Sequence, residues 1–367
     1  SNFQPPGGVH RGLHEADPVK HRGSPIQLMV VPGGFKVACL QLNPIHGRVA
    51  ENRQRARDIL VRHQADLKGL NLLVLPEMAF TGYFWKSKEH IKDVVENSSG
   101  PTSRWCKDIA KWLKCVVCCG IPLRRSKRLL NSMLVFDQRG KLVTNVEKVH
   151  LYHSDKTWAA KGSDFQCLES VDGLPINPVG FGICMDINPE DFKAPPESFE
   201  FANFHLKSGT KLLVFTSAWC KNHPDDAPEA FTTKSDEELS KETLDTWLNR
   251  LQPLHGKDVL FVCADRVGRE PLSLLGHSTD LENQFCGTSC VIDLRTKQVL
   301  EKLSASEEGL LITEIPGSNH GLEANGSCRH EKTPKRPPKR RVQAVPHAVN
   351  VQTANTAPVN LDQSLVK

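Results

Sequence analysis

Short apolar runs alternate along the chain with segments in which apolar residues follow helical spacing. Eight of these runs have the length of a β-strand and are apolar at almost every position, a pattern typical of strands buried on both faces of a sheet. They comprise residues 35–42, 71–75, 115–121, 132–137, 179–184, 211–217, 258–264 and 287–293. We therefore expect a core built on buried strands.

Four segments between the strands are predicted helices. The clearest spans residues 48–68, where Ala56, Ile59, Leu60 and Leu67 recur at helical spacing and would form one apolar face. The other three segments are residues 103–113, 189–207 and 235–251. Because strands and helices alternate, their order predicts an α/β protein in which helices cover sheets.

Both ends of the chain lack this periodicity. Residues 1–33 carry Pro, Gly and scattered basic residues, and residues 318–367 mix Pro, Asn, Gln and Val around a basic cluster. We expect a flexible leader over residues 1–33, a single domain over residues 34–317 and a disordered basic tail over residues 318–367.

The net charge of +5 is concentrated in the expected tail. Residues 329–341 hold seven Lys or Arg and one Glu, and subtracting this local +6 from the total leaves −1 for the rest of the chain. The cluster could be a nuclear-import signal or contact an acidic surface, or it could be a solvated segment without a specific role. A nearly neutral body makes nucleic acid an unfavoured partner.

Composition bounds the cellular context. No apolar run approaches the ~20 residues that a membrane-spanning helix needs, so no membrane association is expected. The twelve cysteines are a small share of 367 residues, and the chain does not open on a charged and then apolar leader. We therefore expect reduced thiols in a cytoplasmic protein, with a nuclear location left open by the basic cluster.

Three residues that carry chemistry stand after predicted strands, where α/β proteins place functional groups. Glu77 would be poorly solvated, which raises a carboxyl pKa and suits it to general-base catalysis. Lys148 could stabilise an oxyanion. Cys184 ends a Gly-rich strand before a helix predicted to begin near Pro189, whose amides would favour a thiolate. Taken singly, each residue also fits an ordinary role, respectively as a turn cap, a solvated lysine and a core thiol.

Taken together, these residues resemble the Glu–Lys–Cys triad of the nitrilase, or carbon–nitrogen hydrolase, superfamily. Glu77 lies in Leu-Pro-Glu-Met-Ala-Phe-Thr-Gly-Tyr and Cys184 in Gly-Ile-Cys-Met-Asp, and the order and intervals of the three residues agree with that family. The similarity extends over about residues 35–315. It implies a four-layer αββα sandwich in a single catalytic domain, with no metal and no organic cofactor.

Within this superfamily the chain most resembles the fungal protein N-terminal amidases. Residues 150–158, His-Leu-Tyr-His-Ser-Asp-Lys-Thr-Trp, and residues 183–195 carry this resemblance. Asn188 stands where many nitrilase relatives have Arg, which favours this branch, and Asp265 stands where the family usually has Asn. The resemblance implies hydrolysis of the side-chain amide of an N-terminal Asn or Gln in proteins or peptides, with release of ammonia, feeding an N-degron pathway.

The resemblance also assigns roles to residues. Cys184 would attack the amide carbon and form a thioester, Glu77 would move the protons, and Lys148 with the backbone N–H of Met185 would hold the oxyanion. The cationic α-amino group of the substrate needs a carboxylate or carbonyl groups, and Asp155 is the first candidate, with loop capping as its alternative.

Further residues are candidates for the substrate pocket. Trp158 could form a pocket wall, or it could be a core residue. Arg266 is a weaker candidate. The complete set of candidate substrate-binding residues is Met185, Asp155, Trp158, Asp186 and Ser289.

Two signals are discounted. Cys115 and Cys118 form a C-x-x-C pattern, but residues three apart on a strand face opposite sides, which favours core cysteines. His150 and His153 lie near Lys148 without a third ligand, so no metal site is predicted.

Two rival functions stay open at this point. One is a small-molecule amidase of the same superfamily, similar to an ω-amidase. The other is a non-catalytic binding protein that uses the basic tail. Superfamily members often dimerise, so a homodimer is also open.

Overall fold

Two six-stranded sheets form the centre of the computed structural model, which describes residue 31 and residues 33–317. The expected tail and almost all of the expected leader lie outside the described residues. The first sheet has the order β14 (Gly309–Ile315), β1 (Phe35–Gln41), β2 (Leu72–Val74), β3 (Val116–Arg125), β4 (Arg128–Phe136) and β5 (Leu142–Glu147). The second has the order β13 (Gln298–Lys302), β12 (Cys290–Asp293), β9 (Leu260–Asp265), β8 (Leu212–Ser217), β7 (Val179–Ile183) and β6 (Gln166–Leu168).

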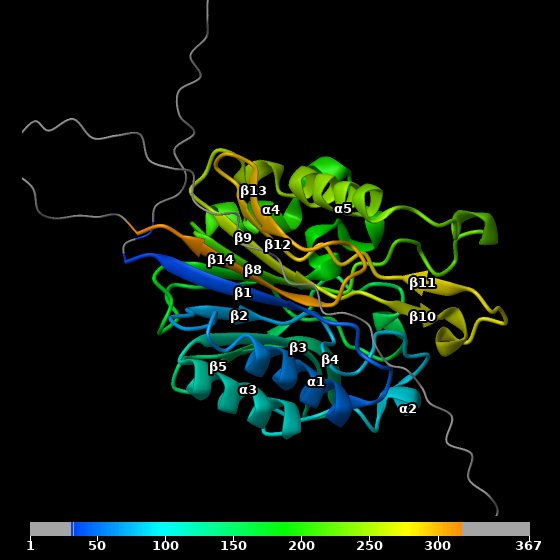
Figure 1. Ribbon diagram of the computed structural model, residues 1–367. Coiled ribbons are helices and arrows are strands. Elements are labelled where there is room, and N and C mark those ends of the chain that lie inside the picture. The colour runs from blue at the N-terminus through cyan, green and yellow to red at the C-terminus, as the bar shows by residue number, and fades with distance from the viewer. Residues whose placement is uncertain (1–30, 32, 318–367) are drawn as a thin grey trace, which may run out of the picture.

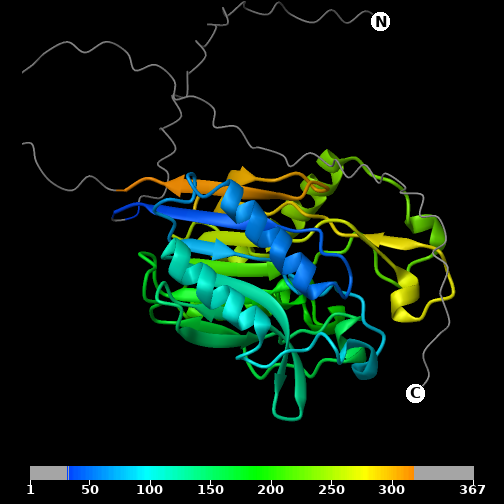
Figure 2. The same ribbon diagram turned by 60° about the horizontal axis from the view of Figure 1, so that its bottom comes forward.

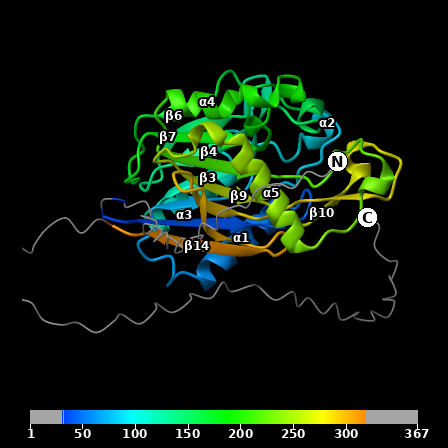
Figure 3. The same ribbon diagram turned by 90° about the horizontal axis from the view of Figure 1, so that it is seen from above.

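Helices cover the outer face of each sheet. Figure 1 shows α1 (Val49–Arg62) and α3 (Pro101–Leu113) against the first sheet, and α4 (Glu200–Lys207) and α5 (Asp236–Arg250) against the second. Figure 1 shows α4 and α5 on the opposite side of the two sheets from α1 and α3, and in the view from above α5 crosses in front of the strands (Figure 3). The layers therefore follow the order αββα, which confirms the predicted fold class.

The apolar runs of the sequence are explained by this layering. In β1, Val37 and Cys39 belong to the core between the two sheets, whereas Ala38 and Leu40 pack against the first helical layer. Because both faces of this strand are covered, residues 37–40 are all apolar and no polar alternation appears. Val31, which falls in the expected leader, is buried in the same inter-sheet core.

The C-x-x-C cysteines are separated by this layering, as expected. Cys118 faces the core between the sheets, whereas Cys115 lies in the core under α1 and α3. Among the residues that the structure describes, all cysteines are free thiols.

The helix predicted over residues 189–207 is wrong in its first half. Short 3-10 turns over Glu190–Phe192 and Pro196–Ser198 occupy this part, and only α4 is α-helical. Pro189, Pro195 and Pro196 lack the backbone N–H that a helix interior requires, which explains the interruption. By contrast, α5 begins where expected, because Ser235 and Glu238 form a capping box.

Two smaller features project from the sandwich. The β3–β4 hairpin extends beyond the helices in Figure 2, and β10 (Arg269–Pro271) pairs with β11 (Glu282–Gln284) in an arm at one end of the sheets. A short helix, α2 (Lys88–Ile91), lies near the same end. No helix in residues 33–317 is long and apolar enough to cross a bilayer.

Candidate active site

Three strand ends bring the predicted triad together. Glu77 lies in the loop after β2, Lys148 directly follows β5, and Cys184 directly follows β7. The first two belong to one sheet and the third to the other, so the site lies where the carboxyl ends of both sheets meet. This arrangement agrees with the expectation drawn from the sequence.

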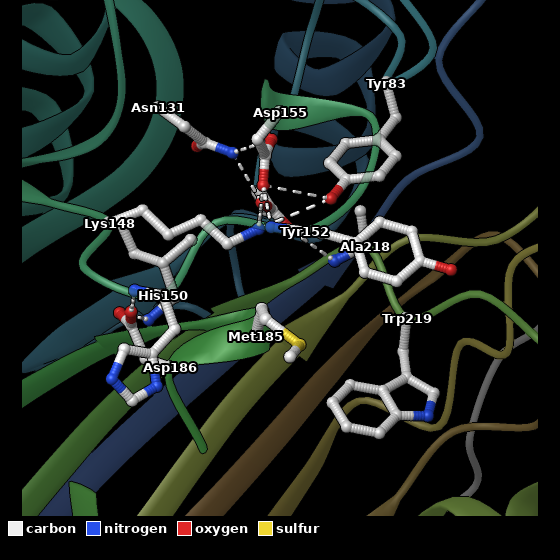
Figure 4. A network of polar contacts seen from close by, with 12 residues as sticks. Tyr83, Asn131, Lys148, His150, Tyr152, Asp155, Met185, Asp186, Ala218 and Trp219 are labelled. Atoms are coloured by element: carbon white, nitrogen blue, oxygen red, sulfur yellow. Dashed lines mark hydrogen bonds and ion pairs between the residues drawn. The ribbon is translucent and has the colours of Figure 1, made fainter. Parts of the chain in front are cut away.

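Lys148 forms the centre of a buried polar network. Its Nζ donates to Glu77 Oε1 at 2.7 Å, to Asp155 Oδ2 at 2.6 Å and to the Tyr83 hydroxyl at 3.3 Å. Figure 4 shows Lys148, Asp155, Asn131 and Tyr83 pointing toward one another. Burial alone would lower the pKa of Lys148, but Asp155 and Glu77 outweigh it and raise this pKa well above its ordinary value. The ammonium group is therefore charged, and all three of its protons have acceptors.

Glu77 is held by three donors and has no exposed surface. Besides Lys148, Asn131 Nδ2 donates to Oε1 at 2.6 Å and the backbone N–H of Ala218 donates to Oε2 at 2.9 Å. Burial raises the pKa of Glu77 above its ordinary value of 4.5; Lys148 opposes this shift and Asp155 adds to it. A carboxyl with a raised pKa accepts and returns protons near neutral pH, as general-base catalysis requires.

Cys184 occupies a strained turn at the end of β7. Its φ of 44° lies in the left-handed region that non-glycine residues seldom adopt, and the residue opens the 3-10 turn Cys184–Ile187. The first residues of such a turn have no partner for their N–H groups inside it, so the amide of Met185 is available beside the sulfur. The predicted helix dipole near Pro189 is replaced by this short turn.

The Cys184 thiol is protonated at rest. Burial raises its pKa well above the ordinary value, and Glu77 adds to this shift, while Lys148 and the N–H of Ala218 oppose it. Two carboxylates and one ammonium already give the network a net negative charge, which disfavours a thiolate. The geometry therefore suits a thiol that transfers its proton as it attacks.

Asp186 joins the Cys184 turn to the segment that carries Lys148. One carboxylate oxygen accepts from the N–H groups of Val149 and His150, both at 2.9 Å, and the other accepts from the N–H of Ile183 at 2.9 Å. Asp186 is buried and lies outside the pocket lining, and its predicted contact with substrate stays a prediction. In the structure its carboxylate joins the segments that carry Cys184 and Lys148.

A pocket of about 590 Å³ opens at Cys184. Most of its surface is apolar, and Met185 contributes to it as predicted. Figure 4 shows Met185, Tyr152 and Trp219 on the side of the network that faces this pocket. The lining comprises Tyr152, Cys184, Met185, Asn188, Phe192, Ala218, Trp219, Cys220, Lys221, Asn222 and His223.

Three other predicted pocket residues lie in the protein interior. Asp155 accepts from Lys148 Nζ, from Asn131 Nδ2 at 2.9 Å and from the N–H of Tyr152 at 2.9 Å, and it is 1% exposed. Trp158 is a core residue. Ser289 is buried behind Asp265, whose N–H donates to Ser289 Oγ at 2.9 Å. Interior contacts hold all three side chains, and their predicted contacts with substrate stay predictions.

Arg266, the weaker pocket candidate, is also buried. Its guanidinium donates to Glu270 at 2.6 Å and lies over the ring of Phe285. Glu270 in turn accepts from the N–H groups of Tyr83 and Phe84. The pair therefore holds the loop that presents Tyr83 to Lys148.

The structure shows what surrounds Asn188 and Asp265, the two residues that depart from the pattern of the wider family. Asn188 lines the pocket, and its Oδ1 accepts from Arg250 Nε at 3.0 Å. Asp265 is fully buried and accepts from the N–H groups of Trp219 and Arg266. Burial raises the pKa of Asp265 well above its ordinary value, which favours the neutral carboxyl, the form that matches the charge of the Asn expected there.

Sequence reasoning missed several residues of the site. Asn131 lies within β4, Tyr83 lies after the Glu77 loop, and the amide of Ala218 follows β8. Ala218 shared one available signal with Glu77 and Cys184, since it also stands directly after a buried strand. Asn131 had a weaker one, as a polar residue inside an apolar strand.

Comparison with known proteins places these residues in a family. A carbon–nitrogen hydrolase family model matches residues 36–193, which include the whole triad. The protein N-terminal amidase of Schizosaccharomyces pombe is 31% identical over 303 residues, covering 77% of this chain and 99% of the relative. The protein N-terminal amidase of Saccharomyces cerevisiae is 29% identical over 211 residues, covering 50% of this chain and 45% of that protein.

A solved structure has the same fold. The crystal structure of an N-terminal amidase with an Asn-Glu-Ala peptide aligns with a TM-score of 0.63 and 18% identity, covering 77% of this chain and 97% of the other. This likeness supports the αββα architecture independently of the sequence match.

Proposed function

This chain belongs to the carbon–nitrogen hydrolase family, and we propose that it is a protein N-terminal amidase that converts an N-terminal Asn, or Gln, to the corresponding acid with release of ammonia. One observation carries the proposal: the Glu77–Lys148–Cys184 network lies at the end of an apolar pocket, in a chain 31% identical to a named protein N-terminal amidase over nearly its full length.

The first half of the reaction forms a thioester. The sulfur of Cys184 attacks the side-chain amide carbon of the N-terminal residue, and its proton passes to Glu77. The C–N bond then breaks, and the nitrogen takes that proton from Glu77 and leaves as ammonia. The backbone N–H of Ala218 contacts both the Glu77 carboxylate and the Cys184 sulfur, and it holds the two groups side by side for this transfer.

The developing oxyanion needs donors at the same place. The N–H of Met185 supplies one, because the turn leaves it without an internal partner. Lys148 supplies its charge, and a direct contact with the oxyanion would replace its longest hydrogen bond, the 3.3 Å contact with Tyr83. The two shorter bonds keep Glu77 and Asp155 in place meanwhile.

The second half releases the product. A water molecule gives a proton to Glu77 and attacks the thioester carbon. The C–S bond breaks, and the sulfur of Cys184 regains its proton from Glu77. One carboxyl group therefore serves both halves of the reaction. Such a group works best when its pKa lies above that of an ordinary carboxyl and closer to neutral pH, and burial shifts the pKa of Glu77 in this direction.

Peptide assays test this function. We expect ammonia release from Asn-Glu-Ala and little from its N-acetylated form, because an N-terminal amidase selects the free α-amino group. Equal rates on both peptides, or activity confined to free small amides, would favour the ω-amidase alternative and overturn the proposal. Cys184→Ala should abolish ammonia release, whereas Cys167→Ala, on the edge strand β6, should retain it.

A further inference from the structure

Three histidines and one carboxylate lie close together beside the pocket, and one of them, His223, lines it. His153 Nδ1 lies 3.4 Å from Asp225 Oδ2, and His223 Nδ1 lies 3.7 Å from the same oxygen. His277 Nε2 lies 3.9 Å from the other carboxylate oxygen. The catalytic cycle described above uses none of these four residues.

The spacing fits a metal ion. A tetrahedral ion with bonds of about 2.0–2.1 Å separates its ligand atoms by about 3.3 Å, close to both distances at Asp225 Oδ2. Ligand atoms of His153, His223 and Asp225 all lie within 4.8 Å of one another. Two imidazoles and a carboxylate are a ligand set that Zn²⁺ and neighbouring transition metals accept.

The ligand atoms are accessible and available. The side chains of His153 and His223 are each 39% exposed and that of Asp225 is 54% exposed, so an ion could enter from solvent. His223 Nδ1 accepts the N–H of Asp225 at 3.2 Å, and coordination through that nitrogen would replace this bond.

We propose that His153, His223 and Asp225 form a binding site for a divalent transition-metal ion such as Zn²⁺, with His277 beside it. His223 lines the pocket, and its ring packs edge-on against Tyr152, which also lines it. An ion would therefore tie the loop of residues 150–153 to that of residues 220–225. Because both loops border the entrance, the bound ion slows substrate entry.

Direct binding tests the site. Cobalt(II), whose absorption spectrum reports its ligands, is added to the metal-free full-length protein carrying Cys184→Ser and Cys220→Ser, which removes both pocket thiols. We expect one ion per chain and a spectrum without thiolate charge transfer. His153→Asn together with His223→Asn should weaken binding by about 100-fold or more, since even outer-shell partners contribute 10–100-fold.

A matched control separates this site from ordinary surface histidines. His63 faces Asp66 at 3.6 Å after α1, so His63→Asn removes a His–Asp pair of similar geometry elsewhere. It should leave cobalt binding unchanged. Binding that survives the double substitution, no stoichiometric binding, or a thiolate spectrum would each overturn the proposal.

The effect on entry is measured separately with thiols intact. Sub-stoichiometric Zn²⁺ should lower kcat/KM of the wild-type chain more than that of His153→Asn, which lies outside the pocket lining. Equal inhibition of both would show that the ion acts elsewhere and would overturn the regulatory part of the proposal. Failure of the amidase function itself would appear as inactivity without added metal.

Discussion

In the proposed cycle Glu77 has the most demanding task of any residue in the site, because it accepts a proton twice, first from the thiol and then from water, and gives one to the leaving nitrogen and one to the sulfur. Its three donors fix the carboxylate, and burial keeps its pKa raised. Glu77→Gln keeps the shape and most hydrogen bonds but removes the base.

We expect Glu77→Gln to lower kcat on an Asn-starting peptide by about 10²–10⁴-fold, the usual contribution of general acid–base catalysis. Steady-state ammonia release measures this, with Glu51→Gln on the exposed face of α1 as the control. A loss below about tenfold would assign the proton transfers to another group.

The pH profile tests the surroundings of the same carboxyl. The ionised form is the active base, so kcat/KM should fall as pH drops through an apparent pKa that lies above 4.5. Asp155 contributes to raising this pKa. Asp155→Asn should therefore move the acid limb of the profile to lower pH, and a limb that moves upward would contradict the network described here.

At this scale the sequence predicted the reacting groups better than their partners. Glu77 and Cys184 each follow a buried strand, a signal that is local and visible, whereas Lys148 follows the partly exposed edge strand β5 and was singled out through the family resemblance. Asp155 was predicted for the substrate, yet it pairs with Lys148, because side-chain direction within a loop depends on contacts with residues remote in sequence. Asn131 was missed for the same reason.

At the scale of elements, β7 and α4 pack unusually closely below the nucleophile. A Cβ at Gly182 would lie 2.4 Å from Phe201 Cζ and 2.9 Å from Phe215 Cδ2. Two residues later β7 delivers Cys184, so this packing sets the depth of the sulfur in the site.

Gly182→Ala should lower the free energy of unfolding by about 1–3 kcal/mol, as overpacking commonly does, and should also lower kcat. Gly309→Ala is the control, since its added Cβ would meet only Leu303 side-chain atoms at 3.8 Å. Urea unfolding compares the two variants. Equal stability of both would show that the helix moves away at no cost.

His205 on α4 makes the stability of the folded protein depend on pH. It is fully buried, and burial lowers its pKa to about 3. In the unfolded chain the imidazole titrates near its ordinary value of 6.5, so below that pH the unfolded state binds the additional proton.

The contribution of His205 to stability is therefore present at neutral pH and is lost as pH falls from 6.5 toward 3. Between pH 7 and pH 5 the loss should be about 2 kcal/mol. Urea unfolding at both values measures it, and His205→Gln should remove this part of the pH dependence. An identical pH dependence in the variant would exclude His205 as its source.

Elements buried on both faces were the ones that sequence predicted. The strands β1, β8 and β9 have near-continuous apolar runs, whereas β5 and β13 lie at sheet edges, carry polar residues and were missed. The helix predicted from residue 189 was wrong in its first half because the prolines in this segment interrupt a helix.

At the scale of the whole molecule, the net positive charge of the chain comes from residues 329–341, and the sequence of the sandwich is nearly neutral. The catalytic network draws only on residues between Glu77 and Ala218. Truncation after residue 317 should therefore leave kcat and KM on a short Asn-starting peptide unchanged within about twofold, while retention on an anionic matrix falls. Loss of activity with retained folding would show that the tail contributes to the site.

The stacking of the two sheets was not evident from hydrophobic pattern alone. Alternating strands and helices indicate an α/β protein, but many layer arrangements satisfy that order. The four-layer form came from the resemblance of three dispersed residues to a family, and the structure explains their dispersal: each stands at a strand end of one of two facing sheets.

The most direct test of the account is the mass of the enzyme during turnover. The full-length protein is mixed with Asn-Glu-Ala, quenched in acid and analysed by intact-mass and peptide-mapping mass spectrometry. The account predicts an adduct equal to the peptide minus ammonia on Cys184, and none with the N-acetylated peptide. Turnover with an adduct on another residue, or equal labelling by the acetylated peptide, would contradict it.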